Sequence, residues 1–408
     1  MSGGQAIVAL APQDWHGQWV NRQHLLSRVG RNHTVLYSTG GWFVWDRRSD
    51  EWRRAPWGGR LQEIDNVRVD ESPRWLMRWP RFPLWDRAVM RLQVRRWIAA
   101  LRRVAPGPLI AYICHPSFFP YVNLIGADRI VYHVYDLYDH QPNWTSELDR
   151  HERELLKRAD LVFCPSEMLA QALREKVERP VEVLPNAANV ALFFEATACS
   201  VEDPPDLREI ARPRIGWIGS LHPQVDYGLI AALARRRPDW NFVFVGGKVA
   251  HVEEPAEREY QECRSLPNVH FLGYKHRDEI PAYVVNMDVH LLCYRMSDAS
   301  WVKVAYPLKL HECLASGRPL VSSDLQMLRV HSDVIRFASG LDEWETAIAH
   351  ALAEGGVGTP DERRAAARNN SWDVRAQQLS DWLAGLDRDR HGGERGVNVR
   401  HGQTPPAL

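Results

Sequence analysis

The feature that most constrains the fold is an alternation of short, mainly apolar segments with longer segments of helical spacing. A strand that is apolar throughout is buried on both faces, and helices supply that cover, so the alternation predicts parallel sheets with helices on both sides. The strands predicted in the first half are Ala6–Leu10, Thr34–Tyr37, Leu109–Cys114, Ile130–Val134, Leu161–Cys164 and Val181–Leu184. The helices predicted between them are Gln18–Val29, Asp86–Arg103, Ser146–Arg158 and Glu167–Lys176.

The same alternation restarts after a polar, proline-bearing linker near Ala198–Pro213. The second set of predicted strands is Arg214–Ile218, Asn241–Val245, Val269–Leu272, Val289–Cys293, Leu320–Ser322 and Val334–Phe337. The predicted helices are Gly228–Arg236, Pro255–Ser265, Glu279–Asn286, Pro307–Ser316, Asp342–Glu354 and a last helical segment, Glu362–Leu386.

This order predicts an α/β protein with two doubly wound, Rossmann-like domains. A length of 408 residues agrees, because a domain takes roughly 100–200 residues. We expect the domains to span residues 1–200 and 201–372, with a helix at 373–387 packing back across them and a disordered tail at 388–408. Ligands of such sheets bind beyond the carboxyl ends of the strands, so a cleft between the domains is the expected site.

Composition excludes two classes of protein. With 45% hydrophobic residues the chain has enough apolar material for two cores, so it is not a long disordered protein. No apolar run approaches the roughly 20 residues that span a bilayer. The six cysteines form no C-x-x-C pair, and no basic segment precedes the first strand. We therefore expect a cytoplasmic protein with reduced cysteines.

Zero net charge conceals a segregation of charge. Residues 1–135 hold 19 Arg, no Lys and ten acidic residues, a net charge of +9, and the remainder holds −9. Ten of the 17 tryptophans precede residue 98, and Arg74–Arg103 alone holds nine Arg, four Trp and one acid, Asp86. A basic, Trp-rich helix suits peripheral contact with the inner membrane face, or an anionic acceptor. A core helix with a solvated basic face is an equally good interpretation. We expect no nucleic-acid partner, because no binding motif is present.

The segment 306–321, YPLKLHECLASGRPLV, has the signals of a helix that leads into a strand. Pro307 suits the first turn and Gly317 suits the C-terminal end. Lys309 and Glu312 are three residues apart and share one helix face. Near a helix start, a lysine can neutralise a diphosphate and a glutamate can accept hydrogen bonds from ribose. By spacing alone, an exposed ion pair explains the two residues as well.

This segment strongly resembles the donor-site signature of the GT-B nucleotide-sugar glycosyltransferases, the family 4-like or group 1 type. RIGWIGS at 214–220, PDWNFVFVGG at 238–247, LPNVHFLGY at 266–274 and NNSW at 369–372 are similar to further parts of that donor domain. DWHG at 14–17 and YDLYD at 135–139 resemble the bacterial subgroup that builds cell-surface polysaccharides, including teichuronic-acid-type transferases.

The resemblance implies a metal-independent transferase that needs no cofactor and uses a nucleotide-diphosphate sugar, most simply a UDP-sugar, as co-substrate. Lys309 would hold the β-phosphate and Glu312 the ribose. The other implied donor-binding residues are Gly219, Ser220, Tyr274, Lys275 and Pro307. The chain departs from many retaining members at two places. Val304 stands where they have a second glutamate, and the loop 219–225 lacks their Arg and Lys.

The acceptor, a sugar, lipid-linked or small-molecule hydroxyl, is expected at the first domain. Asp136 and His115 follow predicted strands and are the candidate catalytic bases, although either also fits a turn or a helix cap. Trp15, Gly17 and His133 are the residues assigned to acceptor binding. Two other functions remain open: a UDP-sugar 2-epimerase of the same fold, and a non-catalytic subunit that binds sugar nucleotides or polysaccharide.

Overall fold

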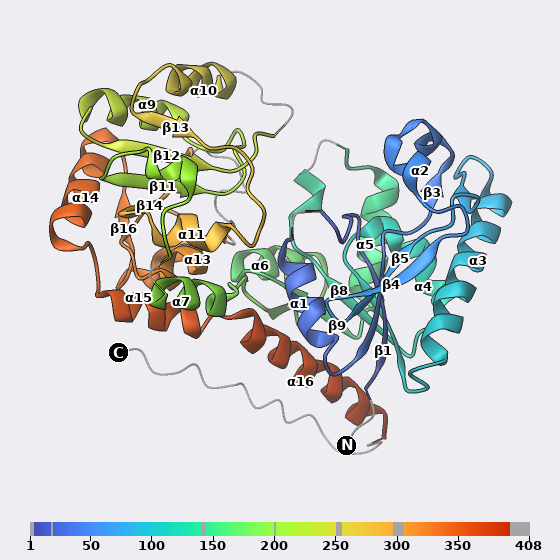
Figure 1. The fold of residues 1–408 in the computed structure, drawn as a ribbon. Coiled ribbons are helices and arrows are strands. Elements are labelled where there is room, and N and C mark those ends of the chain that lie inside the picture. The colour runs from blue at the N-terminus through green and yellow to red at the C-terminus, as the bar shows by residue number, and fades with distance from the viewer. Residues whose placement is uncertain are drawn as a thin grey trace.

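The computed structural model of the chain describes residues 4–17, 19–140, 143–199, 201–249, 255–296, 306–307 and 309–391. These residues form two α/β domains, each built on one main sheet (Figure 1). The predicted fold class, two doubly wound Rossmann-like domains, is confirmed. The predicted tail, 388–408, falls mostly outside the described residues. The predicted domain boundaries stay predictions.

The first domain is built on an eight-stranded sheet of order β10-β9-β8-β7-β1-β2-β5-β4. Its strands are β1 (Ala6–Leu10), β2 (Thr34–Ser38), β4 (Arg60–Ile64), β5 (Val67–Glu71), β7 (Leu109–Ile113), β8 (Arg129–His133), β9 (Leu161–Cys164) and β10 (Glu182–Val183). Its α-helices are α1 (Asn21–Val29), α2 (Asp50–Arg54), α3 (Pro83–Arg102), α4 (Phe119–Ile125), α5 (Ser146–Arg158) and α6 (Glu167–Lys176), and its 3-10 turns are η1 (Val44–Arg48), η2 (Pro116–Phe118) and η3 (Tyr138–His140). A small second sheet pairs β3 (Trp42–Phe43) with β6 (Met77–Arg78).

The edge hairpin β4–β5 corrects the prediction of a purely parallel sheet. These two strands pair antiparallel, and the two residues that join them, Asp65 and Asn66, have φ values of 51° and 65°. Two successive positive φ values define the tight hairpin turn whose twist matches the strands, and Asp and Asn tolerate it. Strand β4 was missed because an edge strand needs few apolar residues: none of its five is fully buried.

The second domain is built on an entirely parallel sheet of order β13-β12-β11-β14-β15-β16 among the described residues. Its strands are β11 (Arg214–Ile218), β12 (Asn241–Val245), β13 (Val269–Phe271), β14 (Val289–Leu292), β15 (Leu320–Ser323) and β16 (Arg336–Ala338). The helices on it are α7 (Val190–Ala198), α8 (Pro205–Arg208), α9 (Tyr227–Arg236), α10 (Ala256–Arg264), α11 (Ile280–Val285), α13 (Lys309–Ala315), η4 (Gln326–His331), α14 (Leu341–Glu354) and α15 (Pro360–Arg368).

The chain crosses between the domains twice, and the two crossings lie side by side. The N–H of Ala188 donates to the carbonyl of Asn370 (3.1 Å), and the N–H of Trp372 donates to the carbonyl of Ala188 (3.1 Å). After the first crossing, α7 packs Val190 and Phe193 into the core of the second domain. After the second, α16 (Trp372–His391) packs Leu379 and Leu383 into the core of the first. Figure 1 shows α16 passing beneath α1. The predicted segment Glu362–Leu386 is therefore two helices: α15 packs on the second domain and α16 packs on the first.

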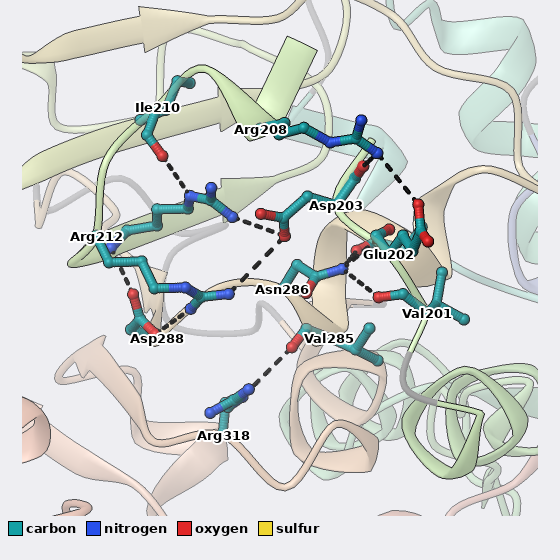
Figure 2. A network of polar contacts seen from close by, with 12 residues as sticks. Val201, Glu202, Asp203, Arg208, Ile210, Arg212, Val285, Asn286, Asp288 and Arg318 are labelled. Carbon is teal, nitrogen blue, oxygen red and sulfur yellow. Dashed lines mark hydrogen bonds and ion pairs between the residues drawn. The ribbon is translucent and has the colours of Figure 1, made fainter. Parts of the chain in front are cut away.

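The predicted linker is held firmly against the second domain. Figure 2 shows the polar network that does this. Asp203 pairs with Arg214 of β11 (2.8 Å), and the Nε of Arg214 donates to the carbonyl of Ile210 (2.8 Å). Asn286, at the end of α11, donates to the carbonyl of Val201 (3.0 Å). The segment 201–213 is thus part of the second domain. The two crossings, at Ala188 and at Asn370–Trp372, are the connections between the domains.

The Trp- and Arg-rich segment of the first domain is anchored by a buried ion pair. Arg78 of β6 donates through Nε (3.1 Å) and Nη2 (2.7 Å) to the carboxylate of Asp86, in the first turn of α3. The two side chains are 10% and 9% exposed. Removal of one member of a buried pair leaves an uncompensated charge, which costs far more than loss of a surface pair. None of the described helices is long and apolar enough to cross a membrane.

We predict that Asp86→Asn lowers the free energy of unfolding of the first domain by about 3–5 kcal/mol, because Arg78 stays buried without its counter-ion. Urea denaturation followed by tryptophan fluorescence measures the change. Asp50→Asn is the matched control, since its pair with Arg53 is 68% and 62% exposed and its loss should cost under about 1 kcal/mol. Equal effects of the two substitutions would contradict the assignment of Arg78–Asp86 as an anchor.

Candidate functional site

The glycine turn after β11 lies at the carboxyl edge of the second sheet, beside the end of β12. Gly219 has φ of 139° and Gly246 has φ of 152°, a region that side chains other than glycine rarely adopt. A Cβ on Gly246 would lie 2.1 Å from the carbonyl oxygen of Gly219. A Cβ on Gly219 would lie 2.6 Å from the Nζ of Lys309. The two glycines therefore let the chain of β11, the chain of β12 and one lysine meet at the same point.

Lys309, the first residue of α13, places its ammonium group over an indole ring. Its Nζ lies 3.3 Å from the ring centroid of Trp217 and 5.9 Å from that of Tyr294. The Nζ atom is buried and has no hydrogen-bond partner among the described residues. Burial lowers the pKa of Lys309 from 10.5 to about 7. A buried ammonium without an ion-pair partner among the described residues is a candidate binding group for an anionic ligand.

Glu312 lies one turn further along α13, half-buried. Burial raises the pKa of its carboxyl group from 4.5 to about 7, and the nearby charge of Lys309 opposes part of that shift. No ion pair joins the two side chains within the described residues, so the alternative of an exposed pair does not hold. Pro307 is buried just before α13, and its carbonyl accepts from the N–H of Leu310 (3.2 Å). Val304 lies outside the described residues.

His222 belongs to the same cluster, and the sequence alone did not identify it. Its ring centroid lies 6.0 Å from that of Tyr294, nearly parallel, and 6.1 Å from that of Trp217. Its Nδ1 is buried without a described partner. Burial, and then the charge of Lys309, lowers the pKa of His222 to about 4, so the imidazole is neutral at pH 7. The loop 219–225 has no Arg or Lys, and its histidine is the residue that joins the cluster.

The remaining donor-side residues lie at the rim. Ser220 is half-buried directly after Gly219, and Tyr274 is 70% exposed beyond β13. Lys275 already has a partner in its own domain: its Nζ donates to the carboxylate of Asp206 in α8 (2.6 Å). The same carboxylate also accepts from the hydroxyl of Tyr283 (2.7 Å). Tyr274 is thus available to stack on a flat ligand, while Lys275 holds α8 in place.

On the first domain, Asp136 and His115 lie beyond the ends of adjacent strands, β8 and β7. Asp136 is half-buried, and its Oδ1 accepts from the N–H of Leu137 (2.8 Å). The Nδ1 of His115 accepts from the N–H of Ser117 (3.2 Å), so the imidazole caps η2. Burial lowers the pKa of His115 to about 4, and the neutral ring carries its proton on Nε2. In that tautomer Nε2 is a donor, which favours Asp136 as the base.

The three residues assigned to acceptor binding lie in different surroundings. His133 is buried, stacked on Phe163 (4.3 Å between centroids), with Nδ1 bonded to the hydroxyl of Tyr112 (2.8 Å). Trp15 is also buried, edge-on to Tyr37 (5.0 Å). Both side chains are thus packed inside the first domain, and their assignment to acceptor binding stays a prediction. Gly17 is exposed, and its N–H donates to the carbonyl of Asp14 (3.3 Å).

The two halves of the site touch each other. The guanidinium of Arg277, two residues beyond Lys275, lies 4.1 Å from the ring centroid of Trp19, which follows the loop after β1. Asn186 of the first domain donates through Nδ2 to the carbonyl of Tyr306 (2.9 Å), three residues before Lys309. The carboxyl edges of both sheets therefore border one site. The described residues contain no group of three His, Cys, Asp or Glu side chains placed to hold a metal ion.

Comparison with known proteins agrees with this division into halves. A family model described as "Glycosyl transferases group 1" matches residues 212–354, and one described as "Glycosyltransferase Family 4" matches residues 44–192. The chain is a GT-B protein of the group 1 and family 4 glycosyltransferase type.

One curated relative is a putative teichuronic acid biosynthesis glycosyltransferase, TuaH, of Bacillus subtilis, 29% identical over 226 residues. The match covers 52% of this chain and 54% of TuaH, so the chain spans about half the length of that relative. Among solved structures, HepE of Anabaena in complex with UDP is similar at 13% identity and a TM-score of 0.64, covering 94% of this chain and all of HepE. A trehalose 6-phosphate synthase of Burkholderia multivorans is similar at 12% identity and a TM-score of 0.66, covering 97% of this chain and all of that one. At these identities the structures show the shared fold.

We predict that one lysine of this protein titrates near pH 7, because burial against Trp217 disfavours the charge of Lys309. Carbon NMR of the lysine Cε atoms measures the midpoint, and Lys309→Met should delete that signal while Lys157→Met, at an exposed position, leaves it. Saturation with pyrophosphate should raise the midpoint, since a bound anion stabilises the ammonium form. A lowest midpoint above 9 would contradict the burial of an unpaired charge at Lys309.

Proposed function

We propose that this protein transfers a sugar from a UDP-sugar, bound by the second domain, to a hydroxyl acceptor bound by the first. The buried, unpartnered Nζ of Lys309 beside Gly219 is the observation that supports this most directly. A diphosphate placed there would supply the missing counter-charge, and the ammonium would stabilise the charge that develops on the leaving UDP. The UDP in the HepE structure favours uridine as the nucleoside.

Glu312 and Tyr274 fit the remainder of such a donor. Glu312 lies one turn beyond Lys309, where its carboxylate would accept hydrogen bonds from the ribose hydroxyls once it is ionised. Tyr274 is exposed at the rim, where its ring would stack on the base. No step of this proposal requires a metal ion, because Lys309 supplies positive charge to the diphosphate.

Asp136 is our proposed base. In a single displacement, the acceptor oxygen bonds to the anomeric carbon as the bond to UDP breaks, and the acceptor proton passes to the Asp136 carboxylate. This reaction inverts the anomeric centre. Asp136 lies beyond β8, at the edge where a doubly wound sheet binds its ligand.

We predict that Lys309→Met and Asp136→Asn separate binding from turnover. Lys309→Met should weaken UDP binding by about 10–100-fold, the worth of a hydrogen bond from a charged group. Asp136→Asn should retain UDP affinity and lower kcat by at least about 100-fold, because general base catalysis contributes that much. Calorimetry with UDP and a UDP-release assay over a panel of UDP-sugars and acceptors measure both.

Three outcomes count against parts of this proposal. Unchanged UDP affinity in Lys309→Met would contradict the assignment of Lys309 to the donor site. Near-normal turnover of Asp136→Asn would contradict the assignment of Asp136 as the base. Tight UDP-sugar binding with no UDP release in the wild type would support a non-catalytic subunit instead.

We also propose that the acceptor is met at a membrane surface, through the segment Arg74–Arg103. Three of its arginines are internal: Arg74 stacks on Trp52, Arg78 pairs with Asp86, and Arg96 pairs with the buried Asp70. The other six are exposed: Arg81, Arg87, Arg91, Arg95, Arg102 and Arg103. Bulky apolar side chains are exposed beside them: Trp75, Trp79, Phe82, Leu84 and Trp85. Exposed Trp and Arg together suit the interface of an anionic bilayer.

We predict that the protein cosediments with vesicles that contain anionic lipid, and less so as salt increases. Arg87→Gln with Arg91→Gln should weaken the association about 30-fold, since each basic side chain near such a surface contributes about 1 kcal/mol. The control is Arg258→Gln with Arg264→Gln, two exposed arginines of the second domain. Equal binding of both double variants, or no binding at low salt, would overturn the membrane surface.

A further inference from the structure

One buried arginine of the first domain differs from every other buried arginine that the structure describes. Arg28 pairs with Asp373, Arg78 with Asp86 and Arg214 with Asp203, while Arg363 donates to three backbone carbonyls, those of Gly317, Val357 and Gly358. Arg22 is 1% exposed, and its Nε and Nη1 are buried with no hydrogen-bond acceptor among the described residues. Two buried guanidinium nitrogens without acceptors are costly, and a bound anion would recover that cost.

Arg22 lies at the part of the first domain where a doubly wound sheet binds ligands. It is the second residue of α1, which follows the central strand β1. Its Cζ lies 4.1 Å from the ring centroid of Tyr135, the residue before Asp136. After burial, its charge is the next cause that lowers the pKa of both His115 and His133. The guanidinium therefore lies at the carboxyl edge of β7 and β8.

The start of α1 adds further positive potential. The helix has nine residues and no acidic residue in its first turn, and the side chain of its N-cap residue, Val20, caps no N–H group, although Gln23 accepts from the N–H of Val20 (3.1 Å). Free N–H groups at a helix start attract anions. Asn21 is buried next to Arg22, and its Oδ1 also has no described partner. The first turn thus offers buried donors beside one buried acceptor, which suits a ligand that has both an anionic oxygen and a hydroxyl group.

We propose that Arg22 and the first turn of α1 bind an oxyanion, a phosphate or a carboxylate, on a hydroxylated acceptor. This inference rests on the proposed function, because it names the acceptor class of that same site. The oxyanion supplies the acceptor for Nε and Nη1, and Asn21 accepts from a neighbouring hydroxyl. The ring of Tyr135 packs against the guanidinium, with 4.1 Å between Cζ and the ring centroid. Arg22 is a binding residue here, and the proton transfer stays with Asp136.

NMR of the arginine Nε–H groups tests this in protein saturated with UDP, which occupies Lys309. Titration with potassium phosphate, or with acetate, is compared with potassium chloride at equal ionic strength. We expect a saturable shift of the Arg22 signal with an oxyanion and none with chloride. The signals of Arg28, Arg78, Arg214 and Arg363 are internal controls, because their partners are already in place. Phosphate against acetate decides between the two oxyanions.

Two variants extend the measurement. Arg22→Gln should weaken phosphate binding at least tenfold and leave UDP affinity unchanged, while Arg22→Lys should retain part of the phosphate affinity. If Arg22→Gln does not fold, hydrogen exchange of the wild-type segment 20–26 replaces it, with phosphate expected to slow exchange of the first-turn amides. The absence of a saturable Arg22 shift in the wild type, or unchanged phosphate affinity in folded Arg22→Gln, overturns the proposal.

The same titration separates this inference from the donor site. If UDP does not bind, the proposed function fails, and the phosphate titration is repeated on Lys309→Met, which lacks the donor-side cation. Phosphate that still shifts Arg22 in that variant supports the subsite without the transferase. If UDP binds but no oxyanion shifts the Arg22 signal, the proposed transferase function stands and the acceptor is neutral at Arg22.

Discussion

Burial of the Lys309 ammonium against Trp217 is the constraint around which the second domain is arranged. An ammonium taken from water without a carboxylate loses several kcal/mol of solvation, and an indole face returns only about 2 kcal/mol. The domain nevertheless holds the lysine there, because Trp217 lies in the core and Gly219 has no Cβ to displace Nζ. The residual cost is visible in the pKa of about 7. An anion that recovers this cost would bind more tightly than it would to a lysine already paired, so the burial of Lys309 favours ligand binding.

The two crossings of the chain between the domains are joined to each other, and this joint lies near the segment that leads to Lys309. Ala188 exchanges backbone hydrogen bonds with Asn370 and Trp372, so the chain that leaves the first domain and the chain that returns form one joint. The linker beyond it is pinned by Asp203 and Arg214, and α16 is pinned to the first domain, where Gln5 donates to the carbonyl of Leu383 (3.2 Å). Rotation of the domains is therefore confined to a short stretch. Because Asn186 borders that stretch and bonds to the carbonyl of Tyr306, such a rotation reaches the segment before Lys309 directly.

The sequence predicted the wholly buried parallel strands, such as β1 and β7, because they are apolar along their whole length, and it missed β3, β4, β5 and β6. The roles of Lys309, Glu312 and Gly219 came from a family resemblance carried by a helix start and a glycine turn, which leave local signals in a sequence, and those roles stay predictions. The sequence could not separate His133 from a ligand-binding histidine, because that distinction depends on Tyr112 and Phe163, neither of which is close to it in the chain. Lys275 shows the same limit: its partner, Asp206, is 69 residues away.

The Trp- and Arg-rich segment shows why composition alone left its role undecided. Arg78 and Arg87 are both arginines near or within one amphipathic helix, yet one neutralises a buried carboxylate and the other faces solvent. The difference comes from two buried acids. Asp86 forms an ion pair with Arg78, and Asp70 forms one with Arg96. Trp97 is likewise internal, donating from its indole to Asp70 (2.6 Å), while Trp79 and Trp85 are exposed. Once the internal partners are assigned, the exposed remainder has six arginines and no acid from its own segment to balance them. An uncompensated basic, aromatic face of that kind is stable in water only through the solvation of its guanidinium groups, and an anionic surface can satisfy the same groups while it also covers the exposed rings.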